Sequence, residues 1–147
     1  MITNTLSTKE SQAVIEFAQS LVQTKSLSGQ EEAVVSLVAA RMKALGYDQV
    51  TIDSMGNVIG RIGSGGKTIL FDSHLDTVDV TDAVEWDIPP FSGEIVDGRL
   101  HGRGSVDMKS SAAASVYAGA IAKKLGLLDA KTVYVSCTVF EEDCDGE

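Results

Sequence analysis

Residues 67–72 have the sequence Lys-Thr-Ile-Leu-Phe-Asp, and residues 132–140 have the sequence Thr-Val-Tyr-Val-Ser-Cys-Thr-Val-Phe. The second stretch is rich in β-branched residues, which are common in strands. Continuous apolar runs of this length are typical of strands that are covered on both faces of a sheet. The two stretches therefore predict two buried strands.

Two amphipathic helices are predicted before these strands. Ser7 and Glu10 have the spacing of a capping box, in which a hydroxyl and a carboxylate bind backbone N–H groups at a helix start. Ser28 and Glu31 have the same spacing and predict a second helix start. Gly46 predicts the end of that second helix, because a glycine commonly follows the last helical turn. The apolar face of the first helix consists of Val14, Ile15, Ala18, Leu21 and Val22.

The rest of the chain alternates between strand and helix patterns. Val50 and Ile52 alternate with polar residues, as in a strand at a sheet edge, and residues 57–62 form a second short strand pattern. Asp97-Gly98 lies between apolar residues and predicts a hairpin. Residues 108–125 are rich in alanine and serine and predict a helix. Because helices alternate with buried strands, we predict an α/β fold, a three-layer mixed sheet with helices on both faces.

The composition is that of a globular protein and limits the classes of partner. The 147 residues match the length of one ordinary domain, and 44% are hydrophobic while 22% are charged. The net charge is −9, with 12 Lys and Arg against 21 Asp and Glu. Nucleic acids and anionic membrane surfaces are bound by basic faces, so we expect neither as a partner.

The sequence also carries expectations about cellular location. Residues 1–12 are polar, without the basic start and apolar segment of a signal peptide. No apolar run approaches the length of a membrane span. The two cysteines, Cys137 and Cys144, are too few for a disulfide scaffold and do not form a CxxC pair. We therefore expect a reducing, cytoplasmic location.

Three familiar motifs are absent or incomplete. Gly66-Lys67-Thr68 resembles the end of a phosphate-binding P-loop, but Arg61 stands where that motif needs a glycine, and a strand pattern follows instead of a helix. Gly102-Arg103-Gly104 begins like a dinucleotide fingerprint, but Asp107 occupies the position of the third glycine. No Gly-x-Ser-x-Gly nucleophile elbow occurs. We therefore assign neither a P-loop nor a dinucleotide fingerprint to this sequence.

Acidic and histidine side chains follow the ends of the two predicted buried strands. His74 and Asp76 come directly after the first strand, and Glu141 and Glu142 come directly after the second. Asp107 lies between them, in a glycine-rich loop that leads into a helix. Ligands of open α/β sheets bind beyond the carboxyl ends of the strands, so these side chains lie where a site is expected. Residues i and i+2 of an extended chain project to the same side, so the Asp76 carboxylate can orient the His74 ring.

Each of these features alone also has an ordinary structural interpretation. A single His-x-Asp is more often a hydrogen-bonded pair in a loop, and the Glu-Glu-Asp run of residues 141–143 is more often a solvated turn. Asp107 alone is an ordinary helix N-cap. His101 lies in the predicted hairpin, and we interpret it as structural. The joint occurrence of the other residues at strand ends favours a functional site.

Three motifs in this order resemble a known family. Residues 73–78 are Ser-His-Leu-Asp-Thr-Val, residues 102–109 are Gly-Arg-Gly-Ser-Val-Asp-Met-Lys, and residues 141–142 are Glu-Glu. This combination resembles the M20 family of metallopeptidases, which includes glutamate carboxypeptidases, aminoacylases, acetylornithine deacetylase and succinyl-diaminopimelate desuccinylase. The resemblance covers essentially the whole chain and implies a zinc-exopeptidase-like fold. It also implies a hydrolase of C–N amide bonds in small peptides or N-acyl amino acids.

The resemblance implies a role for each matching residue. His74 would bind one zinc ion, Asp76 would orient His74, and Asp107 would bridge two zinc ions. Glu141 would be the general base that activates the bridging water, and Glu142 would bind the other zinc ion. A cis peptide bond after Asp107 is also implied. Mixed histidine and carboxylate ligands suit Co²⁺ or Mn²⁺ as well as Zn²⁺.

The resemblance further implies that residues 1–147 form the N-terminal part of a catalytic zinc-binding domain. In the family, each zinc ion has a further ligand downstream of the Glu pair, and a separate smaller domain mediates dimerisation and substrate contact. We therefore expect a fragment, with a homodimer allowed for the full-length protein. The alternative is a catalytically inert truncated chain that binds metal weakly or serves only in assembly. The run Asp143-Cys144-Asp145-Gly146 is similar to a branch of selenium-metabolism-linked hydrolases, in which Cys144 would lie near the site.

Overall fold

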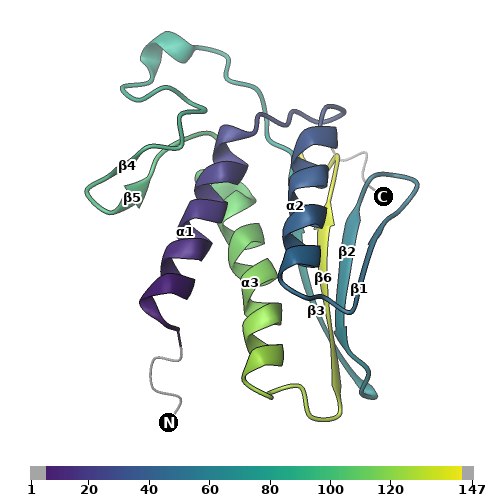
Figure 1. Ribbon diagram of the computed structural model, residues 1–147. Coiled ribbons are helices and arrows are strands. Elements are labelled where there is room, and N and C mark those ends of the chain that lie inside the picture. The colour runs from purple at the N-terminus through teal and green to yellow at the C-terminus, as the bar shows by residue number, and fades with distance from the viewer. Residues whose placement is uncertain (1–5, 144–147) are drawn as a thin grey trace.

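The computed structural model describes residues 6–143 (Figure 1). Three long helices pack beside a four-stranded sheet, and a two-stranded hairpin extends from the long connection between the sheet and the last helix. The helices are α1 (Thr8–Gln23), α2 (Glu32–Ala44) and α3 (Ser110–Lys124), with a short helical segment at Ala83–Glu85 and an irregular, kinked segment at Ser105–Lys109. The strands are β1 (Gln49–Ile52), β2 (Val58–Gly63), β3 (Lys67–His74), β4 (Ile95–Val96), β5 (Arg99–Leu100) and β6 (Lys131–Thr138).

The main sheet is mixed, which confirms the predicted α/β class. Its strand order is β1-β2-β6-β3. The pairs β1–β2 and β2–β6 are antiparallel, whereas β3 and β6 run parallel, with His74 opposite Thr138. A parallel pair needs a crossover connection, and α3 lies in the connection between β3 and β6. The predicted edge strand at Val50 and Ile52 is β1, and the predicted buried strand at residues 132–140 is the central strand β6.

The helices of the described chain lie on one side of the sheet (Figure 1). A Cβ atom added to Gly60 of β2 would meet Met42 of α2, and one added to Gly119 of α3 would lie 3.5 Å from Ile62, two residues further along the same face of β2. The expectation that residues 67–72 are covered on both faces is therefore wrong for the described residues. These residues are exposed, because β3 is the other edge strand and helices cover one face only. A helix layer on the second face stays a prediction.

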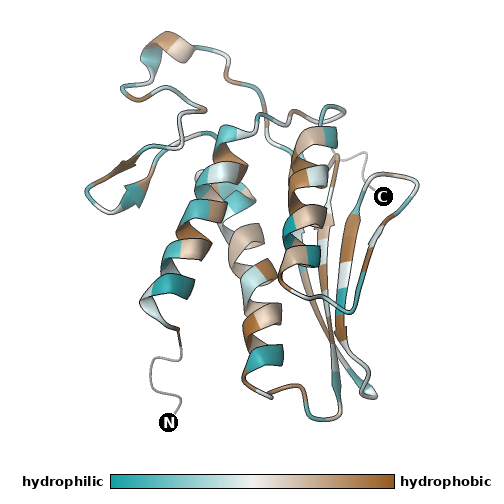
Figure 2. Cartoon of the chain, viewed as in Figure 1, coloured by the Kyte–Doolittle hydropathy of each residue, from teal (hydrophilic) through white to brown (hydrophobic). Residues whose placement is uncertain are grey.

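The hydrophobic core lies between the sheet and the helices. Phe17, Leu21, Val38, Met42 and Val135 are fully buried there. Both α1 and α2 carry apolar and polar residues in successive bands (Figure 2), and each helix buries several of its apolar residues in this core. The buried face of α1 is centred on Phe17 and Leu21, so it is rotated slightly from the predicted face, and Ile15 is 44% exposed. Packing of α1 against α3 brings the Phe17 and Tyr117 ring centroids to 5.9 Å.

Helix ends confirm two of the sequence predictions and correct a third. The Ser7 side chain accepts from the Glu10 backbone N–H, and the Glu10 carboxylate accepts from the Ser7 N–H, so the first capping box is present. Gly46 follows α2 with φ 77°, as predicted for a glycine after the last turn. The predicted second capping box is wrong: α2 has no side-chain cap, because Ser28 and Glu31 bond to distant segments instead.

The hairpin predicted at Asp97-Gly98 is confirmed as β4–β5. Asp97 and Gly98 have φ values of 50° and 74°, the positive pair that a type I′ turn requires. None of the helices in residues 6–143 combines the length and the apolar composition that a bilayer crossing requires.

Candidate metal centre

The candidate centre forms where β3 and β6 end side by side. Because the two strands are parallel and in register, their carboxyl ends lie at the same edge of the sheet. His74 is the last residue of β3, and Glu141 and Glu142 follow β6 by three and four residues. The fold thus brings together two segments more than 60 positions apart in the sequence. This is the edge at which ligands bind in open α/β sheets.

Three side chains converge at this edge. Ligand atoms of His74, Asp107 and Glu142 lie within 4.8 Å of one another. The His74 Nε2 atom is 3.0 Å from Asp107 Oδ1 and 3.7 Å from Glu141 Oε2. One imidazole with several carboxylates is a ligand set that suits Zn²⁺ and related divalent cations. These residues therefore fit a metal ion by their chemistry as well as by their proximity.

The other ring nitrogen of His74 faces Asp76. His74 Nδ1 is 3.1 Å from the Asp76 backbone carbonyl oxygen and 3.4 Å from Asp76 Oδ1. A proton on Nδ1 that is donated to this carbonyl leaves the Nε2 lone pair free, which is the arrangement in which a histidine binds a metal. The sequence predicted this pairing from the side chain of Asp76. The structure adds the backbone carbonyl of Asp76 as the nearer contact.

The Asp76 carboxylate is fully buried and held at one oxygen. Asp76 Oδ2 accepts from the Ser28 hydroxyl at 2.8 Å and from the Glu142 backbone N–H at 3.0 Å. Asp76 Oδ1 has no hydrogen-bond partner and lies beside the His74 ring. The carboxylate therefore joins three segments: the loop after α1, the end of β3 and the turn after β6.

Two opposing effects act on His74. Burial disfavours the charged ring, but hydrogen bonds to Asp107 and to the Asp76 carbonyl, together with the nearby Glu141 and Asp76 charges, raise the pKa of His74 above its ordinary value. The negative environment that stabilises a proton on His74 is the same environment that would stabilise a cation. The site is therefore electrostatically suited to a divalent metal.

The turn after β6 has the bend that adjacent glutamates need. Phe140 has φ 61°, a backbone conformation that is uncommon for a residue with a side chain, and residues 141–143 form a turn. Glu141 and Glu142 can therefore both approach His74, although neighbours in a regular strand would point apart. The Glu141 side chain is 59% exposed and the Asp107 side chain is 76% exposed. Both carboxylates are thus accessible from solvent.

Asp107 is positioned by an irregular segment before α3. Gly104 precedes this segment with φ 79°, and the Asp107–Met108 peptide bond is cis, as the family resemblance implies. Lys109 ends the segment and is completely buried. Its Nζ atom donates to the carbonyl oxygens of Leu21, at 2.9 Å, and Thr24, at 2.6 Å, at the end of α1. Burial lowers the pKa of Lys109 to about 8, and the Asp76 charge acts in the opposite direction.

Sequence reasoning did not identify Lys109 as a structural anchor. The only sequence signal was a lysine at the start of an alanine-rich helix, directly after the glycine-rich loop. Lysine side chains at exposed helix starts are common, and nothing local indicates burial. Its contact with Leu21 of α1, 88 positions away, exists only in the folded chain.

The remaining sequence candidates lie outside the cluster. His101 directly follows β5 of the hairpin, and its backbone N–H donates to the carbonyl of Glu94, which precedes β4, at 2.8 Å. It is not among the three residues that gather their ligand atoms in the described chain. Cys137 is buried in the core, and burial raises the pKa of its thiol to about 12. Cys144, Asp145 and Gly146 lie outside the described residues.

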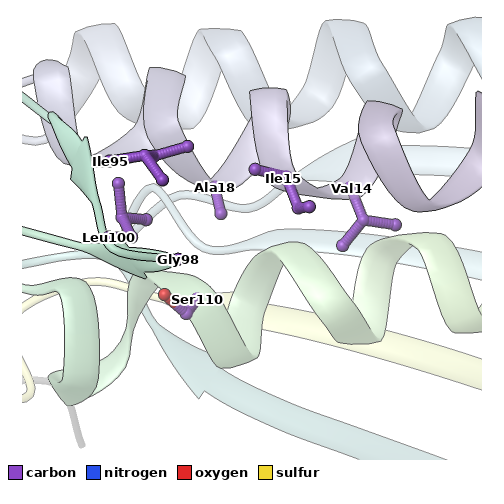
Figure 3. A pocket seen from close by; sticks show the side chains of 7 residues that line it. All are labelled: Val14, Ile15, Ala18, Ile95, Gly98, Leu100 and Ser110. Carbon is purple, nitrogen blue, oxygen red and sulfur yellow. The ribbon is translucent and has the colours of Figure 1, made fainter.

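An apolar groove lies away from the cluster. This groove of about 310 Å³ runs between α1, the β4–β5 hairpin and the start of α3 (Figure 3). Its walls include the apolar side chains of Ile15, Ile95 and Leu100, with Ser110 as the one polar side chain among the lining residues. No imidazole or carboxylate lines it, so the groove lacks the groups that hydrolysis or metal binding needs.

Comparison with known proteins agrees with the geometry. The family model described as peptidase family M20/M25/M40 matches residues 70–147. YgeY of Escherichia coli (strain K12) is 43% identical over 130 residues, which cover 88% of this chain and 32% of that protein. Succinyl-diaminopimelate desuccinylase of Xanthobacter autotrophicus is 39% identical over 103 residues, which cover 66% of this chain and 28% of that protein. The chain spans about a third of the length of these curated relatives.

Solved structures share the fold over nearly the whole chain. The M20 family metallo-carboxypeptidase Sso-CP2 from Sulfolobus solfataricus matches with a TM-score of 0.76 at 21% identity, over 93% of this chain and 34% of that chain. Bacillus subtilis YXEP, described as a dinuclear metal binding peptidase from the M20 family, matches with a TM-score of 0.71 at 18% identity, over 96% of this chain and 38% of that chain. The match of the family model to more than half of the residues, together with this fold, shows that the chain belongs to peptidase family M20/M25/M40.

Proposed function

We propose that the chain supplies the first part of a two-metal site that hydrolyses C–N amide bonds in small peptides or N-acyl amino acids. The observation that carries the proposal is the convergence of His74, Asp107 and Glu142, with Glu141 beside them. Two similar proteins support the proposed substrate class: one is a succinyl-diaminopimelate desuccinylase and the other is a metallo-carboxypeptidase, and both reactions break a C–N amide bond. We propose residues 1–147 as the N-terminal part of the catalytic domain.

The proposed ligands divide between two cations. His74 would hold one, Glu142 would hold the other, and Asp107 would bind both. When bound, a pair of divalent cations supplies an acidified water and polarises the carbonyl group of the substrate. Zn²⁺ is the proposed metal, and Co²⁺ or Mn²⁺ fit the same ligands.

Glu141 and Asp76 have the proposed supporting roles. The Glu141 carboxylate would accept the proton of the attacking water and return it to the leaving nitrogen, as a general base and then a general acid. Its exposed side chain and its position 3.7 Å from His74 Nε2 support this role. Asp76 would hold the His74 ring with Nε2 directed to the metal, which its contacts at Nδ1 support.

A second candidate is a chain that binds metal without catalysis. Two observations favour it for these 147 residues in isolation. The metal-binding group in the described residues contains one histidine and two carboxylates, and the chain spans about a third of its curated relatives. Structural and catalytic zinc sites use at least three protein ligands per ion, so two tight sites need further ligands. Metal stoichiometry distinguishes the two candidates.

The first test is calorimetric titration of the metal-free chain with Zn²⁺. His74→Ala and Asp107→Ala should each abolish the binding, whereas His101→Ala, the matched change at the other histidine, should leave it intact. Two tight ions would support the catalytic candidate, and a single weak ion would support the second candidate. Zinc binding that is indifferent to His74 and Asp107 would refute the site itself.

The catalytic role needs a separate readout. Hydrolysis of N-acetyl and N-succinyl amino acids and of dipeptides should be measured with and without Zn²⁺. Glu141→Gln should keep zinc affinity within a fewfold and lose hydrolysis, because the amide preserves the shape of the side chain but cannot accept the proton. Glu142→Gln should reduce zinc affinity. Equal activity of wild type and Glu141→Gln would exclude Glu141 as the base.

A further inference from the structure

The loop between α1 and α2, residues 24–31, contacts all three segments of the candidate centre. At its start, the Thr24 carbonyl accepts from the Lys109 Nζ atom of the segment that carries Asp107. In its middle, the Ser26 hydroxyl donates to the Leu75 carbonyl at 2.7 Å, and the Thr77 N–H donates to the Ser26 carbonyl at 2.9 Å. This loop is therefore paired with the end of β3.

Ser28 reaches the carboxylate behind His74. Its hydroxyl donates to Asp76 Oδ2 at 2.8 Å, and the Glu142 N–H donates to the same oxygen. With Oδ2 fixed by two donors, the carboxylate cannot turn freely, and Oδ1 stays 3.4 Å from His74 Nδ1. Ser28 therefore influences His74 indirectly, because it fixes the Asp76 carboxylate that lies beside the Nδ1 atom of the ring.

Glu31 reaches the turn that carries the two glutamates. Its side chain is buried, with 5% of the residue exposed, and its Oε1 atom accepts from the Phe140 N–H at 3.1 Å. Phe140 has the positive φ that starts the turn, and Glu141 and Glu142 follow immediately. A buried carboxylate that binds this N–H fixes the backbone from which both glutamate side chains project.

We propose that Ser28 and Glu31 are positioning residues of the metal centre: Ser28 holds the Asp76 carboxylate against His74, and Glu31 holds the turn that presents Glu141 and Glu142. Neither belongs to the three residues whose ligand atoms gather at the centre. The inference rests on the proposed function, because it assigns these residues to the same site. The pattern Ser-x-x-Glu resembles a capping box, but α2 has no side-chain cap, so both side chains serve the centre instead.

The expected size of the effect follows from metal-site chemistry. Partners that orient a ligand from behind commonly change metal affinity by 10- to 100-fold when they are removed. Ser28 contacts Asp76 and not the proposed ligand His74 itself. We therefore expect the lower end of this range, a weakening of zinc binding by about tenfold, for Ser28→Ala. Ser28→Thr keeps the hydroxyl and should restore affinity to within about threefold of wild type.

The experiment measures zinc affinity of the 147-residue chain by competition with a chelator, and the visible absorption spectrum of the Co²⁺-loaded chain. Ser20→Ala is the matched control, because the Ser20 hydroxyl bonds within α1 to the Glu16 carbonyl, away from the centre. Ser28→Ala should lose about tenfold in affinity and change the Co²⁺ spectrum. Ser20→Ala should change neither. Urea unfolding of each variant separates a general loss of stability from a change in the centre.

Glu31 is tested by two substitutions. Glu31→Ala removes the acceptor for the Phe140 N–H and should weaken zinc binding, whereas Glu31→Gln keeps an acceptor oxygen and should be close to wild type. If Ser28→Ala does not fold, Ser28→Cys takes its place, because a thiol is a weaker donor of similar size, and an intermediate loss of affinity is expected.

Two outcomes overturn the inference and differ from each other. His74-dependent zinc binding that is unchanged in Ser28→Ala and Glu31→Ala would refute the positioning roles and leave the proposed function intact. Zinc binding by wild type that does not depend on His74 would refute the proposed function and the inference with it.

Discussion

Replacing Gly104 by alanine should destabilise the loop that carries Asp107 through two separate effects. Gly104 has φ 79°, in the left-handed region, where a residue with a Cβ atom costs about 1–2 kcal/mol. A Cβ atom at this position would lie 2.6 Å from Thr77 Cγ2 and 3.2 Å from Lys109 Cδ. Forcing an extra methyl group into a packed site costs about 1–3 kcal/mol more. The free energy of unfolding should therefore fall by about 2–5 kcal/mol.

Gly126 provides the matched control. It also has a positive φ, 66°, but nothing lies within 4 Å of an added Cβ atom, and the residue is exposed. Gly126→Ala should therefore show only the backbone cost of about 1–2 kcal/mol. Both variants include the cost of a positive φ. The difference between their losses of free energy of unfolding therefore measures the steric contact with Thr77 and Lys109 alone.

The assay is urea unfolding followed by circular dichroism, with zinc affinity as a second readout. With a urea m value of about 1.5 kcal/mol/M, the midpoint should fall by roughly 1–3 M in Gly104→Ala and by about 0.7–1.3 M in Gly126→Ala. Zinc affinity should fall only in Gly104→Ala, because that loop carries Asp107. Equal destabilisation of the two variants would refute the steric reasoning.

Two other predictions concern pH. Hydrogen bonds from Lys124 and then from Ser7 lower the pKa of Glu10 to about 2, so its contribution to stability is complete above pH 4.5 and is lost as the pH falls toward 2. Acid unfolding should therefore begin at higher pH in Lys124→Met than in wild type, and coincident acid transitions would contradict this expectation. Lys109→Met should lower the free energy of unfolding by about 1–3 kcal/mol at pH 7, because two buried carbonyl groups lose their donor. Since burial lowers the pKa of Lys109 to about 8, wild type binds fewer protons folded than unfolded between pH 8 and pH 10.5. The difference in the free energy of unfolding between wild type and Lys109→Met should therefore grow as the pH rises through 8. Urea titrations at pH 7 and pH 9.5 measure this difference, and a smaller difference at pH 9.5 than at pH 7 would contradict the prediction.

Local patterns predicted most of the elements correctly. The capping box of Ser7 and Glu10 joins residues three positions apart, and the turn at Asp97-Gly98 is decided by the backbone of those two residues. The β-branched run in residues 132–140 predicted the central strand β6. Each of these features depends on interactions within a few residues, so the sequence alone contains the information.

The motifs also predicted which side chains gather. The proximity of His74, Asp107 and Glu142 could be predicted because each lies at a strand end or in a glycine-rich loop, and parallel strands end at a common edge. Their catalytic and ligand roles remain predictions, because only a bound metal and measured activity test them.

Long-range partners were decided only by the tertiary structure. Ser28 and Glu31 have the local spacing of a helix cap, yet they bond to Asp76, 48 positions away, and to Phe140, 109 positions away. The apolar run of residues 67–72 was predicted to be buried, but exposure depends on the neighbours of a strand, and β3 has a partner on one side only. Lys109 is buried because the end of α1 offers its carbonyl groups to the Nζ atom. Sequence determines the short-range preferences of a segment, whereas the folded topology decides which distant polar groups it contacts. In this chain those long-range hydrogen bonds hold the segments that carry the candidate metal ligands.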